Sequence, residues 1–317
     1  MTTDVIPLGT ASAVPTRERH LSALAVQRKG RILLFDCGEG TQYRLLHAGL
    51  SRARIDAIFV THLHGDHCYG LPGLLSSLAL QQRTDPVTLV LPPGGRAMLK
   101  AIPGAAPSDL PFPVRITDPG PDLTAATVYE TEELTVEARP LEHSTFAMGF
   151  RLAERTRPGR FHPERARALG VPEGPAFARL QAGEAVTVAD GTTVRPDQVL
   201  GPPRSGVVLA YVTDTRPCAS GRALAADADL LYHDATFTDA LHARAVETGH
   251  STAREAAAVA RDAGAERLLL GHISARYDDP APLEAEAGAV FPRAEIAEEL
   301  RRYRLDPREN APESSSS

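Results

Sequence analysis

Residues 61–67 read Thr-His-Leu-His-Gly-Asp-His and place three imidazoles and a carboxylate directly after an apolar segment. That segment, residues 55–60, reads Ile-Asp-Ala-Ile-Phe-Val and predicts a buried strand. Loops at the ends of buried strands are where a rigid scaffold commonly holds binding and catalytic residues. Neutral imidazoles and carboxylate oxygens are good ligands for zinc-like cations. The run therefore predicts a metal site at a strand end.

The order of residues in this motif favours two metal ions over one. His62 and His64 alternate as in an extended chain, so their side chains should point the same way. A turn at Gly65 then lets Asp66 and His67 face a second position. A solvated polar loop would explain one histidine, but it does not explain three histidines and an aspartate after a buried strand.

The motif resembles the signature of the metallo-β-lactamase superfamily, and other blocks narrow the resemblance to the ribonuclease Z (tRNA 3′-processing endonuclease) family. In chain order these blocks are residues 8–15 (Leu-Gly-Thr-Ala-Ser-Ala-Val-Pro), 35–42 (Phe-Asp-Cys-Gly-Glu-Gly-Thr-Gln), 69–75 (Tyr-Gly-Leu-Pro-Gly-Leu-Leu), 250–252 (His-Ser-Thr) and 271–277 (Gly-His-Ile-Ser-Ala-Arg-Tyr). Together they run from about Leu8 to about Arg304, nearly the whole chain. The ordered set is far more specific than the histidine motif alone.

The length of 317 residues allows one large α/β domain with a sizeable core. The resemblance implies a four-layer αβ/βα sandwich, with a catalytic domain formed by residues 1–149 and 205–305. A helix should open at Ser251 with a capping box and close at Gly264. Apolar or alternating patterns predict strands at residues 5–8, 23–26, 32–35, 55–60, 86–91, 134–138, 207–212, 230–232 and 267–270.

Residues 150–204 differ in character, because proline and glycine are frequent and six arginines stand against two glutamates between residues 151 and 170. A segment this long is an improbable plain loop in a compact domain. A basic patch suits phosphate, and a solvated arginine-rich helix accounts for the charge equally well. The resemblance favours a projecting tRNA-binding arm. The expected RNA contacts are Arg155, Arg157, Arg160, Gly174 and Pro175, with Arg17 and Arg19 near the N-terminus.

The resemblance also implies a ligand set for two Zn²⁺ ions per chain, and the same donor types suit Mn²⁺ or Fe²⁺. His143, Asp214 and His272 each follow a predicted strand, and Asp214 would bridge the ions. The first ion would be held by His62, His64, His143 and Asp214. The second ion would be held by Asp66, His67, Asp214 and His272.

Three further roles follow from the resemblance. Asp66 would accept a proton from the attacking water, and His250 would protonate the leaving oxygen. Asp234 would support His250, in the block His-Asp-Ala-Thr where the family has His-Glu-Ala-Thr. Residues 15–20 read Pro-Thr-Arg-Glu-Arg-His where many members carry Pro-X-Lys-X-Arg-Asn. This second departure bears on recognition of the tRNA end.

The expected function is a zinc-dependent endoribonuclease that cuts precursor tRNA just 3′ of the discriminator nucleotide, acting as a homodimer. A small-molecule metallo-hydrolase, arylsulfatase- or phosphodiesterase-like, would share the ligands but would not need a long basic arm. A catalytically inactive tRNA-binding protein is disfavoured by the complete ligand set.

The sequence contains no stretch of about 20 apolar residues, so we expect no membrane-spanning helix. Three scattered cysteines argue against a disulfide framework and favour location in the reducing cytoplasm. The composition of residues 306–317 predicts a disordered tail.

Overall fold

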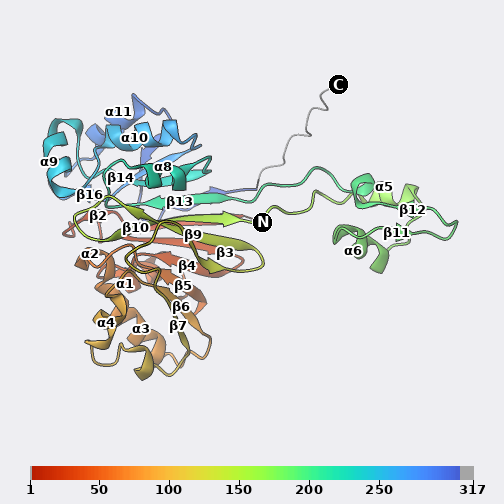
Figure 1. Ribbon diagram of the computed structural model, residues 1–317, viewed down its shortest axis with the longest axis horizontal. Helices are drawn as coiled ribbons and strands as arrows, with labels where there is room; N and C mark the ends of the chain where they lie inside the picture. The colour runs from red at the N-terminus through yellow and green to blue at the C-terminus, as the bar shows by residue number, and fades with distance from the viewer. Residues whose placement is uncertain (1, 308–317) are drawn as a thin grey trace. The chain divides into compact units, whose positions relative to one another are not determined.

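The computed structural model describes residues 2–307, and its chain divides into two compact units (Figure 1). The larger unit combines Met1–Ala153 with Val208–Asp306, and the smaller unit contains Glu154–Val207. From residue 308 onward, the predicted tail lies outside the described residues. In the described part of the chain, no helix is long and apolar enough to cross a membrane.

The first sheet of the larger unit has seven strands in the order β18-β1-β3-β4-β5-β6-β7. Its strands β4 to β7 run parallel, and β1, β3 and β18 pair in antiparallel fashion. The bounds are β1 Thr3–Gly9, β3 Ala23–Arg28, β4 Arg31–Phe35, β5 Ile55–Phe59, β6 Val87–Val90, β7 Val114–Thr117 and β18 Tyr303–Leu305.

The second sheet also has seven strands, in the order β17-β15-β14-β13-β10-β9-β8. Strands β13, β14, β15 and β17 are parallel neighbours, so their carboxyl ends meet at one edge of the sheet. The bounds are β8 Ala126–Glu130, β9 Leu134–Leu141, β10 Ala147–Glu154, β13 Val208–Val212, β14 Leu230–Asp234, β15 Leu268–Gly271 and β17 Ala294–Ile296. A separate short parallel pair joins β2 Ala11–Ser12 to β16 Ile273–Ser274.

Helices cover the outer face of each sheet (Figure 1). The helices over the first sheet are α1 Thr41–His47, α2 Gly65–Cys68, α3 Gly70–Leu80 and α4 Gly95–Lys100. The helices over the second are α8 Ala219–Ala225, α10 Ala253–Asp262 and α11 Ala281–Gly288, and α9 His242–Thr248 packs against the 3-10 turn that precedes it. Single 3-10 turns lie at Arg52–Arg54, Pro107–Asp109 and Asp239–Leu241.

Aromatic side chains join the two sheets across the middle of the sandwich. Phe35 and Phe59 of the first sheet stack with ring centroids 4.7 Å apart. Both rings contact Phe150 of the second sheet, and Phe35 also contacts Tyr211. Buried aromatic pairs of this kind add to the free energy of area burial. The layers are therefore helix, sheet, sheet and helix, which confirms the predicted four-layer sandwich.

The smaller unit has secondary structure and a core of its own. It contains α5 Pro163–Ala168, α6 Pro175–Gln181, β11 Val186–Thr187, β12 Thr193–Val194 and α7 Pro196–Val199. Seven buried side chains form its core: Ala166, Val171, Leu180, Val186, Val188, Val194 and Val199. This local apolar cluster holds the short helices and strands together. The long segment is therefore a small folded unit and not a plain loop.

The helix predicted to open at Ser251 begins one residue later than expected. Its N-cap is Thr252, whose side chain accepts from the backbone N–H of Glu255 while the Glu255 side chain accepts from the N–H of Thr252. Ser251 instead donates its hydroxyl to the carbonyl of Thr215 at 2.6 Å. The capping box was therefore predicted correctly, but the side chain at its first position was not.

Candidate metal centre

The histidine motif lies at the carboxyl end of β5, where the chain leaves the first sheet. His62 and His67 are fully buried, and Asp66 and His67 lie on the single helical turn α2. The turn at Gly65 is thus helical, and it brings the His67 ring beside that of His62, with centroids 4.3 Å apart. Gly70, just beyond, must lack a side chain because a Cβ there would lie 2.1 Å from the carbonyl oxygen of Gly38.

The first cluster contains His62, His64, His143 and Asp214, whose donor atoms all lie within 4.8 Å of one another. His64 Nδ1 lies 2.9 Å from His62 Nε2 and 3.3 Å from His143 Nε2. Asp214 Oδ2 lies 3.5 Å from His62 Nε2 and 3.9 Å from His143 Nε2. The structure thus brings together four residues that are up to 152 positions apart in the sequence, since His62 and Asp214 are its extremes.

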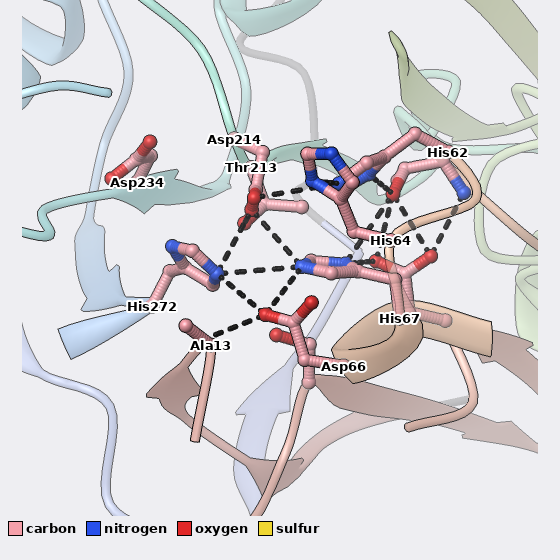
Figure 2. A network of polar contacts seen from close by, with 12 residues as sticks. Ala13, His62, His64, Asp66, His67, Thr213, Asp214, Asp234 and His272 are labelled. Carbon is pink, nitrogen blue, oxygen red and sulfur yellow. Dashed lines mark hydrogen bonds and ion pairs between the residues drawn. The ribbon is translucent and has the colours of Figure 1, made fainter. Parts of the chain in front are cut away.

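The second cluster contains Asp66, His67 and His272, and it faces the other oxygen of Asp214 (Figure 2). Asp214 Oδ1 lies 3.2 Å from both His67 Nε2 and His272 Nε2. The two imidazole nitrogens are 3.3 Å apart. Asp66 Oδ2 lies 3.4 Å from His272 Nε2 and 3.5 Å from His67 Nε2. Asp214 is therefore common to both clusters and contributes one oxygen to each.

These separations fit divalent cations. Ligand atoms about 2.0–2.1 Å from a tetrahedral ion lie about 3.3–3.4 Å from one another. The distances that join His67 and His272 to each other, to Asp66 Oδ2 and to Asp214 Oδ1 are 3.2–3.5 Å and agree with this value. In the first cluster the range is wider, 2.9–3.9 Å. The donor set of imidazoles and carboxylates suits Zn²⁺ and chemically similar ions.

The second ring nitrogen of several histidines is already bound to an acceptor or a hydroxyl. His67 Nδ1 lies 2.7 Å from Asp36 Oδ2, and His143 Nδ1 lies 2.9 Å from the carbonyl oxygen of Gly249. When Nδ1 carries the proton and donates to these oxygens, the Nε2 lone pair is left for a metal ion. This arrangement orients each ring toward its cluster.

Asp36 is a functional residue that the motif reasoning did not select. Its fully buried carboxylate accepts from the N–H and hydroxyl of Thr61, from Tyr211, and faces His67. Tyr211 belongs to the second sheet, so Asp36 connects both sheets at the motif. The available signal was a single aspartate directly after the apolar strand of residues 32–35.

Three residues of the centre have left-handed backbone conformations, which are uncommon for residues other than glycine. The φ angles are 58° at Asp36, 51° at Asp214 and 56° at His272. Each residue follows a strand, so the chain turns sharply where the side chain enters the centre. Such conformations persist only where surrounding contacts impose them, and they concentrate at functional sites.

Asp66 faces the second cluster as an ionised carboxylate. Its Oδ2 accepts from the backbone N–H of Ala13 at 2.8 Å. Burial raises the pKa of Asp66, but hydrogen bonds from His272 and His67 outweigh burial and hold that pKa below its usual range. Asp66 therefore carries negative charge at neutral pH, as either a metal ligand or a proton acceptor requires.

His250 and Asp234 form a pair at the edge of the centre. His250 Nδ1 lies 2.9 Å from Asp234 Oδ2, so the shorter aspartate reaches the imidazole. Burial disfavours the charged imidazole, but the Asp234 carboxylate more than compensates and raises the pKa of His250 to about 9. The His250 ring stacks on His272 with centroids 5.1 Å apart. Donor atoms of His250, Asp214 and His272 also lie within 4.8 Å of one another.

Asp234 itself is held firmly. It is fully buried and accepts from the backbone N–H of Thr215 and from the N–H and hydroxyl of Thr236. The Thr236 hydroxyl also lies 3.0 Å from His272 Nδ1. This hydroxyl therefore links Asp234, the partner of His250, to His272 of the second cluster.

The residues expected to contact RNA lie in both units. Arg17 is exposed in the larger unit, whereas Arg19 is buried and donates to the carbonyls of Ser274 and Tyr277. The Arg19 guanidinium therefore fastens the N-terminal loop to the end of β16 and to the loop that follows it. In the smaller unit, Arg155 and Arg160 are exposed, Arg157 pairs with Glu154, Gly174 precedes α6 and Pro175 begins it.

A cavity of about 460 Å³ opens onto the two clusters, and its lining includes His64, Asp66, Asp214, His250 and Tyr69. Another cavity, of about 360 Å³, is lined by no histidine. Its arginines Arg28 and Arg31 pair with Glu133 and Asp56. Of these two cavities, the first combines open space with a set of metal-binding side chains.

Fold and site together define a metallo-β-lactamase-type protein, and the comparisons with known proteins agree. A family model described as a beta-lactamase superfamily domain matches residues 198–273, and the model of the anti-Pycsar protein Apyc1 matches residues 3–100. The metallo-beta-lactamase fold protein YhfI from Bacillus subtilis superposes with a TM-score of 0.68 at 17% identity, covering 96% of this chain and 99% of that one.

The particular family follows from closer relatives. Ribonuclease Z of Salinibacter ruber is 76% identical over 314 residues, 99% of this chain and 98% of that protein. Ribonuclease Z of Haloferax volcanii is 49% identical over 285 residues, 90% of this chain and 89% of that protein. The short form of human tRNase Z has a TM-score of 0.68 at 28% identity, covering 95% of this chain and 98% of that one. The chain belongs to the ribonuclease Z family, which confirms the resemblance.

Proposed function

We propose that this protein is a metal-dependent endoribonuclease that removes the 3′ trailer from precursor tRNA. Cleavage leaves a 3′-hydroxyl on the tRNA and a 5′-phosphate on the trailer. The observation that carries the proposal is the pair of donor clusters joined by Asp214, in a chain that is 76% identical to a ribonuclease Z.

The proposed cofactor is two Zn²⁺ ions per chain, with Mn²⁺ or Fe²⁺ as chemically suitable substitutes. His62, His64, His143 and Asp214 would hold one ion. Asp66, His67, His272 and Asp214 would hold the other. When bound, such a pair would polarise the phosphoryl oxygens of the substrate and lower the pKa of the attacking water.

The side chains supply proton transfer on either side of the phosphorus. Asp66, ionised and exposed to the cavity, is placed to accept the proton of the attacking water. His250, charged beside Asp234, is placed to donate a proton to the 3′ oxygen as the bond from that oxygen to phosphorus breaks. Asp234 orients the His250 ring and stabilises its positive charge, because its carboxylate is fixed by three other donors.

Residues 150–204 would serve as an inserted tRNA-binding arm, with the catalytic domain formed by residues 1–149 and 205–305. The support is the resemblance, the separate core of the smaller unit and the exposure of Arg155, Arg160, Gly174 and Pro175 in that unit. Arg157 would contribute through its partly exposed guanidinium, and Arg17 would contact the tRNA end from the larger unit.

Deleting residues 155–195 tests the arm. Cleavage of precursor tRNA should collapse, whereas hydrolysis of a small phosphodiester should survive because the metal ligands all lie outside the deletion. Equal retention of both activities would remove the arm from the proposal. Equal loss would call for a check of folding, by the unfolding transition and metal content of the deletion protein.

The resemblance also supports a homodimer acting in the cytoplasm, and the three free cysteines are compatible with a reducing compartment. The mass of the protein in solution, measured by light scattering, tests the dimer: a mass of about 68 kDa, twice the chain's 33.9 kDa, supports it, and the monomer mass contradicts it.

The deciding experiment is incubation of the purified protein with a precursor tRNA that carries a 3′ trailer, with and without a chelator, followed by mapping of the new ends. A chelator-sensitive cut directly after the discriminator nucleotide supports the proposal. An intact precursor together with chelator-sensitive hydrolysis of a small phosphodiester would overturn it in favour of a small-molecule hydrolase.

A further inference from the structure

Tyr69 is an exposed aromatic residue at the cavity that contains the metal centre. Its side chain is 68% exposed, although large aromatic rings usually bury most of their surface. It lines the cavity together with His64, Asp66 and His250. None of the catalytic or metal-binding roles proposed above involves this ring.

The motif itself holds the ring in place. Tyr69 follows Gly65 by four residues, and its backbone N–H donates to the Gly65 carbonyl at 3.0 Å, as in one turn of helix. Side chains on a helix lean toward its N-terminus, so the Tyr69 ring lies back over Gly65. Its Cδ2, Cε2 and Cζ atoms stand 2.4–2.9 Å from the place where a Cβ on Gly65 would be. The ring thus occupies the space that the missing side chain leaves.

This contact restricts the ring on one side and leaves most of its surface open. A ring held before binding loses little conformational entropy when a partner stacks on it. Proteins that bind single-stranded nucleic acid use such rings to stack bases, because every nucleobase has a flat π face. The 3′ end of a precursor tRNA around the cleavage site is single-stranded, and its phosphate must reach the clusters beside Tyr69.

We infer that Tyr69 is the stacking platform for a nucleobase next to the scissile phosphate, and thereby a substrate-positioning residue. The inference rests on the proposed function, because it requires an RNA substrate. Its ligand is either the discriminator base or the first base of the trailer. Stacking on the open ring fixes the adjacent phosphodiester relative to the metal ligands.

The experiment combines changes in the protein with changes in the RNA. Tyr69→Ala removes the ring, Tyr69→Leu keeps apolar bulk over Gly65 without a π face, and Tyr69→Phe keeps the ring. Tyr43→Ala is the matched control, since Tyr43 is 63% exposed on α1 but does not line the cavity. Each protein is given three precursor tRNAs: an unmodified one, one abasic at the discriminator and one abasic at the first trailer position.

On the unmodified substrate, Tyr69→Ala and Tyr69→Leu should lower kcat/KM by about 5- to 150-fold, the range expected for the loss of one base stack. Tyr69→Phe and Tyr43→Ala should stay within about 3-fold of the wild type. On one of the two abasic substrates, wild type and Tyr69→Ala should become nearly equal, because the partner of the ring is already gone. Metal content and the unfolding transition should be unchanged in all four variants.

A wild-type protein that cleaves all three substrates, with the Tyr69→Ala loss equal on each, would overturn the inference and leave Tyr69 a purely structural residue. Full activity of Tyr69→Leu would overturn it as well, since apolar bulk would then suffice. A wild-type protein that leaves the unmodified precursor intact would overturn the proposed function, and the stacking role with it. Cleavage of the unmodified precursor by the wild-type protein therefore distinguishes the two failures.

Discussion

The two sheets contribute to the metal centre in different ways. The first sheet supplies His62, His64, Asp66 and His67 from a single run after β5. The second sheet and its connections supply single residues, each from a separate strand end or loop: His143, Asp214, Asp234, His250 and His272. The ligands from the first sheet are neighbours in the sequence. The residues from the second sheet come together only when its parallel strands are paired in register.

The register of the second sheet shows how this works. Val212 of β13 pairs with His233 of β14, and Asp234 pairs with Gly271 of β15. Parallel neighbours in this register end at the same edge, so the residues that follow them enter one space. Residues that look isolated in the sequence can therefore contribute as much to a site as a compact motif does. Four substitutions test this comparison.

Asp214→Ala should have the largest effect, because one residue from the second sheet serves both clusters. We expect cleavage to fall by at least about 10³-fold, because the clamp on both sides of the phosphate is lost. Metal content, measured by mass spectrometry of the dialysed protein, should fall for both sites. His64→Ala is the matched comparison, since His64 belongs to the first cluster alone and should spare the second ion.

If His64→Ala removed both ions and Asp214→Ala only one, metal binding would depend mainly on the contiguous motif of the first sheet. That result would contradict the central role proposed for Asp214 of the second sheet.

Asp234→Ala should have the next largest effect, on turnover rather than on metal. Without the carboxylate, His250 loses the group that raises its pKa and fixes its ring, so kcat should fall by about 10²- to 10³-fold. Metal content should stay at the wild-type level. Asp234→Glu, which restores the carboxylate of the family block, should recover part of the rate. Unchanged turnover in Asp234→Ala would remove Asp234 from the mechanism.

Asp36→Asn should weaken metal binding at the second cluster. The amide cannot accept from His67 Nδ1, Thr61 and Tyr211 as the carboxylate does, so the His67 ring loses its orientation. Loss of such an outer partner typically lowers metal affinity by about 10- to 100-fold. Competition with a coloured chelator measures that affinity directly, without an activity assay.

Tyr211→Phe is the control for Asp36→Asn, because it removes one hydrogen bond from the same carboxylate and leaves the contact with His67. Its metal affinity should lie close to the wild-type value. Affinity lost equally in both variants would mean that contact between the sheets, rather than the His67 partner, governs binding.

Glu255→Gln should have the smallest effect and should act on stability. Arg216 donates to both Glu255 and the carbonyl of His250, so this ion pair anchors the His250 loop. Burial raises the pKa of Glu255, but hydrogen bonding to Arg216 outweighs it and lowers that pKa below the usual value. The charged pair thus stabilises the folded state at neutral pH, by about 1 kcal/mol for a partly buried pair.

The sign of the pH dependence follows from the lowered pKa. The stabilisation is present above the pKa of an unfolded glutamate, about 4.5, and is lost as pH falls through the lower folded value. Urea unfolding at pH 7 should therefore separate Glu255→Gln from the wild type, and the difference should shrink below about pH 4. A difference independent of pH would mean that the capping box, not the charge, carries the effect.

Much of the fold was predictable because its central strands are continuous apolar runs. Strands β4, β5, β13 and β15 are buried along nearly their whole length and were predicted within one or two residues. Edge strands such as β7 and β17 escaped prediction. Their residues are only partly buried or exposed, so they carry no strong apolar signal.

The sequence by itself determined the chemistry available to this protein: which imidazoles and carboxylates exist, which of them are adjacent, and which family the ordered blocks resemble. Only the tertiary structure decided which oxygen of Asp214 faces which cluster, that Asp36 contacts and orients His67, and that Arg19 is buried. The physical reason is that donor identity is a property of each residue. Donor direction instead depends on strand register and on left-handed turns that only the packed sheets impose.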